Sequence, residues 1–167
     1  PAGGYIITAQ GTATNTITIR GNNNVVVASD AHVPGSFMDA IFRLEGADYL
    51  ILEQFVMMEN PSATNASDAT NTVTEWGVAL LASSLTNGCQ NNIIRNNTIS
   101  LRVSAVDRNT FGIYSNVRHT TTSVLGGGDP TVFSGTNSNN KIHNNSINNV
   151  NFGISFTGSG ISGNADT

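Results

Sequence analysis

A short unit that recurs along the chain constrains the fold more than any other feature of the sequence. Residues 90–100 read QNNIIRNNTIS and residues 139–148 read NNKIHNNSIN, so Asn145 follows Asn97 by 48 residues. Both copies share the pattern Ile-x-x-Asn-x-Ile, in which a polar corner separates two β-branched residues suited to short strands. Recurrence of one strand–corner–strand unit is typical of a solenoid, in which each turn packs on the one before.

Asn97 and Asn145 are expected at equivalent corners of neighbouring turns. A corner Asn can hydrogen bond backbone groups that a bend leaves unpaired, and two stacked Asn side chains can bond each other. Each such bond contributes about 0.5–1.5 kcal/mol net. A weaker copy at residues 51–56, Ile-x-x-Gln-x-Val, adds Gln54 as a third member of the predicted ladder. Asn is also a common turn residue, but two of them in matching frames favour the ladder.

A second unit, aromatic-Gly-aliphatic, alternates with the first. It begins at Trp76, Phe111 and Phe152. Each of these aromatic residues lies two positions before an aliphatic residue that is expected to face the interior. Strand alternation therefore predicts an internal aromatic stack, rather than a sugar-stacking strip on the surface.

The constant order of the two units predicts an all-β fold, a right-handed parallel β-helix of about four coils with three short strands each. Loops shorten along one ridge of the coil and lengthen along another, and the longest are residues 61–74 and 117–138. We expect residues 1–167 to form a single β-helix domain and to be a segment of a longer protein.

The composition excludes several classes of partner. Charged residues make up 11% of the chain, the formal net charge is −4, and the seven Lys and Arg residues are scattered singly. No basic patch is apparent, so nucleic acid is not an expected partner. No apolar run approaches the roughly 18 residues of a membrane span. The single cysteine, Cys89, is interpreted as a small buried residue.

Three blocks carry a resemblance to known proteins: TEWGVALL at 74–81, NTFGIYSNVR at 109–118 and NFGISF at 151–156. With the repeats, they resemble the right-handed β-helix, pectin-lyase-like superfamily. More narrowly, they are similar to repetitive segments of large secreted surface proteins of Gram-negative bacteria that are exported by the type IX route. The resemblance implies a secreted or cell-surface location, and it is compatible with lyases, hydrolases and adhesins alike.

The row of residues expected on the outer face of the aromatic-Gly strands is almost uncharged. Strand alternation places Arg43, Ala79, Tyr114 and Ser155 there. The row offers no carboxylate pair for glycoside hydrolysis and no Asp cluster for calcium. We therefore expect no metal, no cofactor and no catalysis by this segment.

The weak catalytic candidates are Arg118, His119 and Lys141. An Arg could neutralise a uronate carboxylate while a His moves a proton. Lone charges in a loop are more often simply solvated, so the pair Arg118–His119 is interpreted mainly in that way.

Two hypotheses follow. In the leading one, the chain is a non-catalytic β-helix segment of a large secreted or cell-surface bacterial protein, an adhesin or stalk scaffold with a glycan as candidate ligand. Further coils or a partner protein are expected at its C-terminal end. The alternative is a fragment of a polysaccharide lyase or glycoside hydrolase that acts on uronate-containing glycans.

Overall fold

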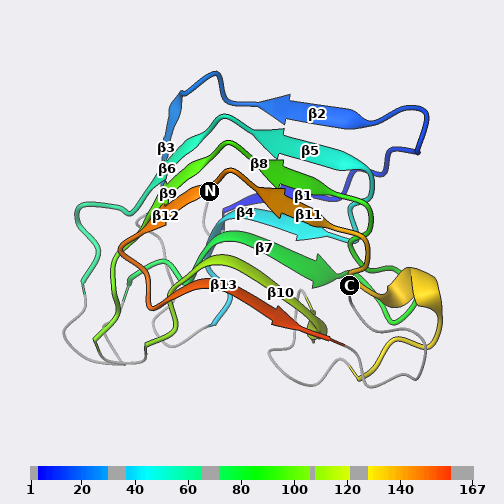
Figure 1. The fold of residues 1–167 in the computed structure, drawn as a ribbon. Helices are drawn as coiled ribbons and strands as arrows, with labels where there is room; N and C mark the ends of the chain where they lie inside the picture. Colours follow the sequence, from blue (N-terminus) through cyan, green and yellow to red (C-terminus); the bar gives the residue numbers. More distant parts are fainter. Residues whose placement is uncertain (1–3, 30–36, 65–71, 106–107, 121–127, 159–167) are drawn as a thin grey trace.

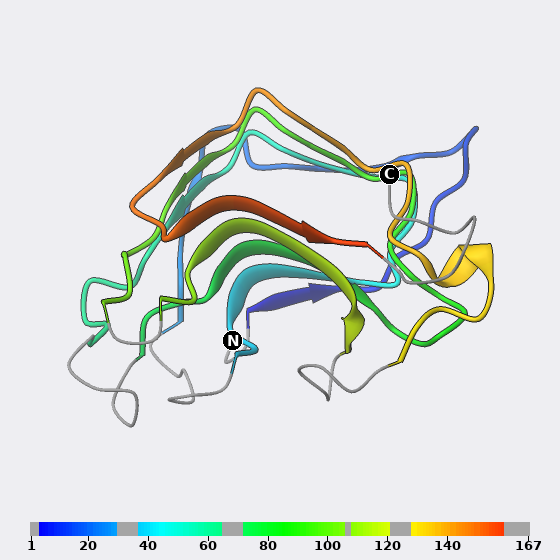
Figure 2. The same cartoon turned by 60° about the horizontal axis from the view of Figure 1, so that its bottom comes forward.

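The structure, a computed structural model, describes residues 4–29, 37–64, 72–105, 108–120 and 128–158. These residues form thirteen strands, which are arranged in three parallel sheets that wrap around one core. Figures 1 and 2 show the chain passing through the sheets in the same rotational sense at every turn, as a right-handed coil. The predicted parallel β-helix is confirmed.

Each sheet contains the equivalent strands of successive coils, and every pairing between neighbouring strands is parallel. Sheet 1 has the order β1 (Tyr5–Ile7), β4 (Ala40–Glu45), β7 (Trp76–Ala82), β10 (Phe111–Thr120), β13 (Phe152–Thr157). Sheet 2 has the order β2 (Ile17–Arg20), β5 (Leu50–Glu53), β8 (Ile93–Arg95), β11 (Lys141–His143). Sheet 3 has the order β3 (Val25–Val27), β6 (Val56–Met58), β9 (Thr98–Ser100), β12 (Ser146–Asn148).

Four coils of three strands are therefore complete, and β13 begins a fifth, as the repeat predicts. The corners between sheets 2 and 3 are short, for example residues 96–97 and 144–145. The long connections lead into or out of sheet 1: residues 59–75 join β6 to β7, and residues 121–140 join β10 to β11. A short 3₁₀ helix, η2 (Phe133–Gly135), interrupts the second of these connections.

The interior is filled by aliphatic side chains that stack from coil to coil. Leu52 lies opposite Ile94 in sheet 2, Met57 lies opposite Ile99 in sheet 3, and all four side chains are completely buried. Complete burial of one such side chain stabilises a fold by about 1.5–3 kcal/mol. The repeated apolar positions of the sequence are thus the source of the stack.

The corner between sheets 2 and 3 corrects one prediction. The register places Leu52 opposite Ile94, so Phe55, and not Gln54, lies opposite Asn97. Gln54 instead has a positive φ of 60°, like Asn96 with 56°. The prediction of Gln54 as a ladder residue is wrong, because the match of residues 51–56 to the repeat by residue type lies one residue out of register with the strand pairing.

The aromatic-Gly strands correct a second prediction. A Cβ atom on Gly112 would lie 2.4 Å from Ile147 Cγ2, so Gly112 faces the interior, as does the next residue, Ile113. Two consecutive residues face inward, and the alternation is shifted by one. Phe111 and Trp76 consequently pack on the outer face of sheet 1, and the predicted internal position of the aromatic residues is wrong.

Candidate functional site

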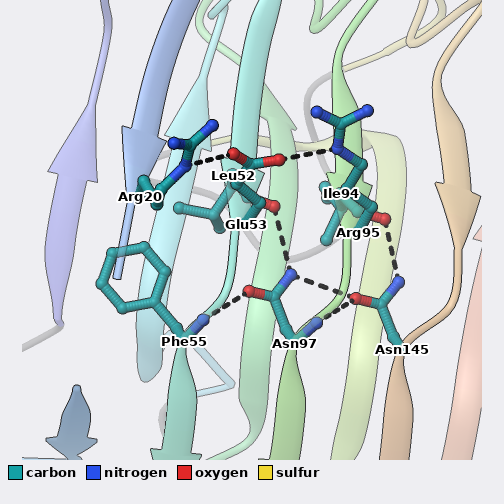
Figure 3. Close-up of polar contacts among 8 residues, drawn as sticks. All are labelled: Arg20, Leu52, Glu53, Phe55, Ile94, Arg95, Asn97 and Asn145. Atoms are coloured by element: carbon teal, nitrogen blue, oxygen red, sulfur yellow. Dashed lines mark hydrogen bonds and ion pairs between the residues drawn. The ribbon is translucent and has the colours of Figure 1, made fainter. Parts of the chain in front are cut away.

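Asn97 and Asn145 join three consecutive coils at the corner between sheets 2 and 3 (Figure 3). Asn97 Oδ1 accepts the Phe55 N–H at 3.0 Å, and Asn97 Nδ2 donates to the Leu52 carbonyl at 3.1 Å. Asn97 Nδ2 also donates to Asn145 Oδ1 at 3.0 Å, the bond that the repeat predicts. Asn145 Oδ1 in turn accepts the Asn97 N–H at 3.0 Å. Each Asn side chain therefore satisfies backbone groups of the preceding coil.

A second ladder of the same design lies at the other end of sheet 2. Asn92 Oδ1 accepts the Leu50 N–H at 3.0 Å, and Asn92 Nδ2 donates to the Ala47 carbonyl at 2.7 Å. In the next coil, Asn140 Oδ1 accepts the Asn92 N–H at 2.9 Å. Sequence reasoning missed this ladder, although its members are also 48 residues apart.

Cys89 lies inside the coil next to this second ladder. The Leu44 and Leu81 carbonyl oxygens lie 3.2 and 3.3 Å from Cys89 Sγ, where they share its single proton, and the Cys89 N–H donates to Asn137 Oδ1 at 2.8 Å. Burial raises the pKa of the thiol to about 12, so Cys89 is a protonated core residue and no nucleophile.

The outer face of sheet 1 carries a buried polar network that the sequence did not reveal. The Tyr114 hydroxyl lies 3.1 Å from His119 Nδ1, and Asn116 Nδ2 donates to the same hydroxyl at 3.0 Å. The Tyr114 hydroxyl thus links the Asn116 amide to the His119 ring in one network. Burial, aided by the charge of Arg43, lowers the pKa of His119 to about 4. His119 is therefore neutral at pH 7.

Aromatic side chains close this network off from solvent. The ring of Phe37 lies 5.0 Å from that of Trp76 and 5.3 Å from that of His119, and Trp76 stacks on Tyr114 at 4.9 Å. His119 and Trp76 are completely buried. Among the described residues, Trp76 Nε1 finds no hydrogen-bond partner. The outer face of β7 and β10 is thus a second small core, and a polymer substrate cannot reach His119 there.

The three weak catalytic candidates do not converge. Arg118, the neighbour of His119 on β10, is half-exposed and holds both carboxylate oxygens of Asp129, at 2.7 and 3.0 Å. Asp129 raises the pKa of the Arg118 guanidinium. Lys141 lies on β11, in sheet 2. The geometry therefore supplies no acid–base pair from these residues.

An ion-pair ladder crosses the outer face of sheet 2 (Figure 3). Glu53, which is 2% exposed, accepts from Arg20 at 2.6 Å and from Arg95 at 2.7 Å. The hydrogen bond from Arg95, followed by that from Arg20, lowers the pKa of the Glu53 carboxyl. Basic residues that are far apart in the sequence, Lys141 included, thus gather on one sheet, which sequence reasoning missed.

Comparisons with protein-family models, with curated proteins and with solved structures found no match for the chain. Within the described ranges, no group of three or more His, Cys, Asp and Glu side chains is arranged to hold a metal ion. No helix in the same part of the chain is long and apolar enough to cross a membrane. The aromatic residues Phe111 and Phe152 do stack, at 4.9 Å, but on the outer face of sheet 1.

Proposed function

We propose that the chain is a non-catalytic β-helix segment of a large secreted or cell-surface protein, in which it serves as a stalk or adhesive scaffold. One observation carries this proposal. The outer face of sheet 1 is filled by its own aromatic and polar side chains, with His119 completely buried and neutral at pH 7. A face closed in this way favours a structural role over the processing of a polymer.

The Asn ladders support the same role. Asn92 and Asn97 are almost completely buried, and each satisfies an N–H and a carbonyl of the preceding coil. A buried donor or acceptor that loses its partner costs about 1–3 kcal/mol, so the ladders bind each coil firmly to the next. Such a coil transmits position and force along its axis without needing a mobile site.

The edge of β13 supports docking of another structural element. Phe152, Ile154 and Phe156 are each 49% exposed on this strand, which is the outermost strand of sheet 1. Among the described residues, the backbone N–H groups of Asn140 and Asn145 donate no hydrogen bond. Their counterparts Asn92 and Asn97 donate to an Asn side chain of the next coil. The proposed occupant is therefore a further β-helix coil with Asn at both corners.

The cellular location belongs to the same proposal. The blocks at 74–81, 109–118 and 151–156 resemble repeats of Gram-negative surface proteins exported by the type IX route. We propose an extracellular location on that resemblance, with further coils of the pectin-lyase-like type as neighbours. Fractionation of the source cells with an antibody against this segment tests the location.

Assays for cleavage test the absence of catalysis. Uronate polysaccharides are incubated with the chain. Ultraviolet absorbance of unsaturated ends reports lyase activity, and the amount of new reducing ends reports hydrolase activity. We expect no product above the level of a boiled control. Cleavage that disappears in Arg118→Ala would overturn the proposal and establish the enzyme alternative.

Sedimentation tests the docking edge separately. We expect the chain to self-associate with rising concentration, and Ile154→Lys to weaken that association, because an exposed strand edge with apolar side chains pairs readily with another edge. Met58→Lys, at an exposed apolar residue of sheet 3, is the control. A concentration-independent monomer of the unmodified chain would contradict the docking edge.

A further inference from the structure

We propose that Met38 is a site of reversible oxidation, at which hydrogen peroxide converts the thioether to a sulfoxide and thereby opens the aromatic cover on the outer face of sheet 1. The aromatic cover is the ring of Phe37 lying over Trp76 and His119. The observation that carries the proposal is a contact of 3.1 Å between Met38 Sδ and His119 Nε2 beside this cover. The proposal depends neither on the cellular location of the chain nor on docking at β13.

The chain contains three methionines, and their surroundings differ. Met57 is completely buried in the interior of the coil. Met58 is 43% exposed at the end of a strand of sheet 3. Met38 is partly buried and packs against the aromatic cluster on the outer face of sheet 1. A small oxidant can thus reach Met38 and Met58, and at Met38 the product of oxidation meets a packed cluster.

The contact with His119 determines what an added oxygen does at Met38. A thioether sulfur can only accept a hydrogen bond, so His119 Nε2 is the donor in this contact. A sulfoxide is polar, and its oxygen would accept from the same donor at a separation of about 2.9 Å. The present 3.1 Å between Sδ and Nε2 leaves no room for an oxygen atom between them. The oxidised side chain must therefore move away from His119.

The backbone next to the sulfur is held in place, which limits where this movement can occur. The Met38 and Asp39 N–H groups both donate to Glu75 Oε2, at 3.2 and 2.7 Å. Arg43 Nη1 donates to the Met38 carbonyl at 3.3 Å. The displacement therefore falls on the Met38 side chain, which has three rotatable bonds, and on the preceding residue, Phe37.

Displacement of Phe37 would expose side chains that the closed cover seals. The Phe37 ring lies 5.0 Å from that of Trp76 and 5.3 Å from that of His119, and both of these residues are completely buried. Additional atoms in a packed core force side chains out of their positions and lower stability. We therefore expect the oxidised chain to have an open and less stable outer face of sheet 1, and reduction of the sulfoxide to close it again.

The modification is a transfer of one oxygen atom. A lone pair of Met38 Sδ forms the S–O bond while the O–O bond of hydrogen peroxide breaks. The proton of the transferred oxygen passes to the leaving oxygen, which departs as water. The sulfur loses two electrons and the peroxide gains them. Cys89 does not compete for the oxidant, because it is completely buried and burial raises the pKa of its thiol to about 12.

Peroxide treatment of the full chain tests the proposal, with peptide mass spectrometry to locate the added oxygen. The same treatment of Met58→Leu removes the other accessible methionine. Trp76 is the single tryptophan, so quenching of its fluorescence by acrylamide reports the opening of the cover. We expect oxygen at Met38, stronger quenching and a thermal midpoint lower by about 2–6 °C. Methionine sulfoxide reductases should reverse both changes.

Two substitutions at Met38 separate the effect of the sulfoxide from other damage. Met38→Leu keeps an apolar side chain of similar volume, so peroxide should leave its thermal midpoint and its fluorescence quenching unchanged. Met38→Gln places a polar group beside His119 and should reproduce the stronger quenching without peroxide.

Three results would overturn the proposal. They are an unmodified Met38 after treatment that fully oxidises Met58 in the unsubstituted chain, a Met38 sulfoxide that changes neither quenching nor midpoint, and equal changes in Met38→Leu. None of these measurements depends on cleavage of a polysaccharide or on self-association. Failure here is therefore distinguishable from failure of the proposed scaffold function.

Discussion

Substitution of Asn97 by Ala probes the feature that joins the coils. The side chain is 2% exposed and forms three hydrogen bonds, to the Phe55 N–H, the Leu52 carbonyl and Asn145 Oδ1. Positive φ occurs at the preceding residue, Asn96, so an Ala at position 97 adds no backbone strain. The measured effect therefore reports the lost side chain alone.

The magnitude follows from the groups that the substitution leaves behind. The Phe55 N–H and the Leu52 carbonyl lose the Asn97 side chain, and each costs about 1–3 kcal/mol if it finds no other partner. Asn145 Oδ1 keeps a donor, because the Asn97 N–H still bonds it at 3.0 Å. We expect the free energy of unfolding to fall by about 2–6 kcal/mol, the cost of the two backbone groups that lose their partner.

The assay is equilibrium unfolding in urea, compared with that of Asn148→Ala. Asn148 is exposed, and among the described residues its amide bonds only the Ser146 hydroxyl, at 3.2 Å, so its loss should cost less than about 0.5 kcal/mol. The slope of unfolding free energy against urea should be the same in both variants, which allows midpoints to be compared. Equal midpoints for the two variants would show that Asn97 is an ordinary turn residue and would refute the ladder.

Three further predictions concern other parts of the coil. The pKa of His119 is about 4 in the fold against an ordinary value of 6.5, so on acidification the unfolded chain takes up this proton before the folded chain does. The free energy of unfolding should therefore fall between pH 6.5 and pH 5, and His119→Gln should reduce this pH dependence in urea titrations. Glu53→Gln should lower the urea midpoint at pH 7; because the pKa of Glu53 is lowered in the fold, the difference should vanish as acid protonates the wild-type carboxylate. Gly112→Ala should destabilise by about 1–3 kcal/mol, since its Cβ would lie 2.4 Å from Ile147 Cγ2, whereas Gly153→Ala meets nothing within 4 Å and should leave the thermal midpoint unchanged.

The repeat pattern of the sequence predicts the architecture, but it does not predict the register of every strand. The repeat of 48 residues aligned Asn97 with Asn145, because both copies contain the same corner. The copy at residues 51–56 has Phe55 in place of the ladder Asn. Gln54 is the residue of this copy most similar to Asn, so the comparison of residue types matches Gln54 to the ladder position. Where another residue replaces the ladder Asn, the sequence alone does not show that a copy of the repeat is aligned one residue away from its true register.

The candidate site was less accessible to sequence reasoning. Arg118 and His119 are neighbours in the sequence, yet one holds Asp129 at the surface and the other is buried against Tyr114. Glu53 and its partners Arg20 and Arg95 come from three different coils and lie 33 and 42 residues apart in the sequence. Residues that meet only because coils stack carry no shared pattern within any one coil.

The repeat pattern of the amino acids is enough to predict a coil of short parallel strands. In a solenoid each strand pairs with the equivalent strand one repeat away, so the period of the sequence repeat also predicts which strands pair. The directions of the side chains of sheet 1, by contrast, depend on how the sheets pack against each other. At Gly112 and Ile113 two consecutive residues face inward, where Gly112 lies against Ile147 of the neighbouring sheet. This break in the alternation involves a contact between sheets, and it leaves Phe111 outside the core in which strict alternation would have placed it.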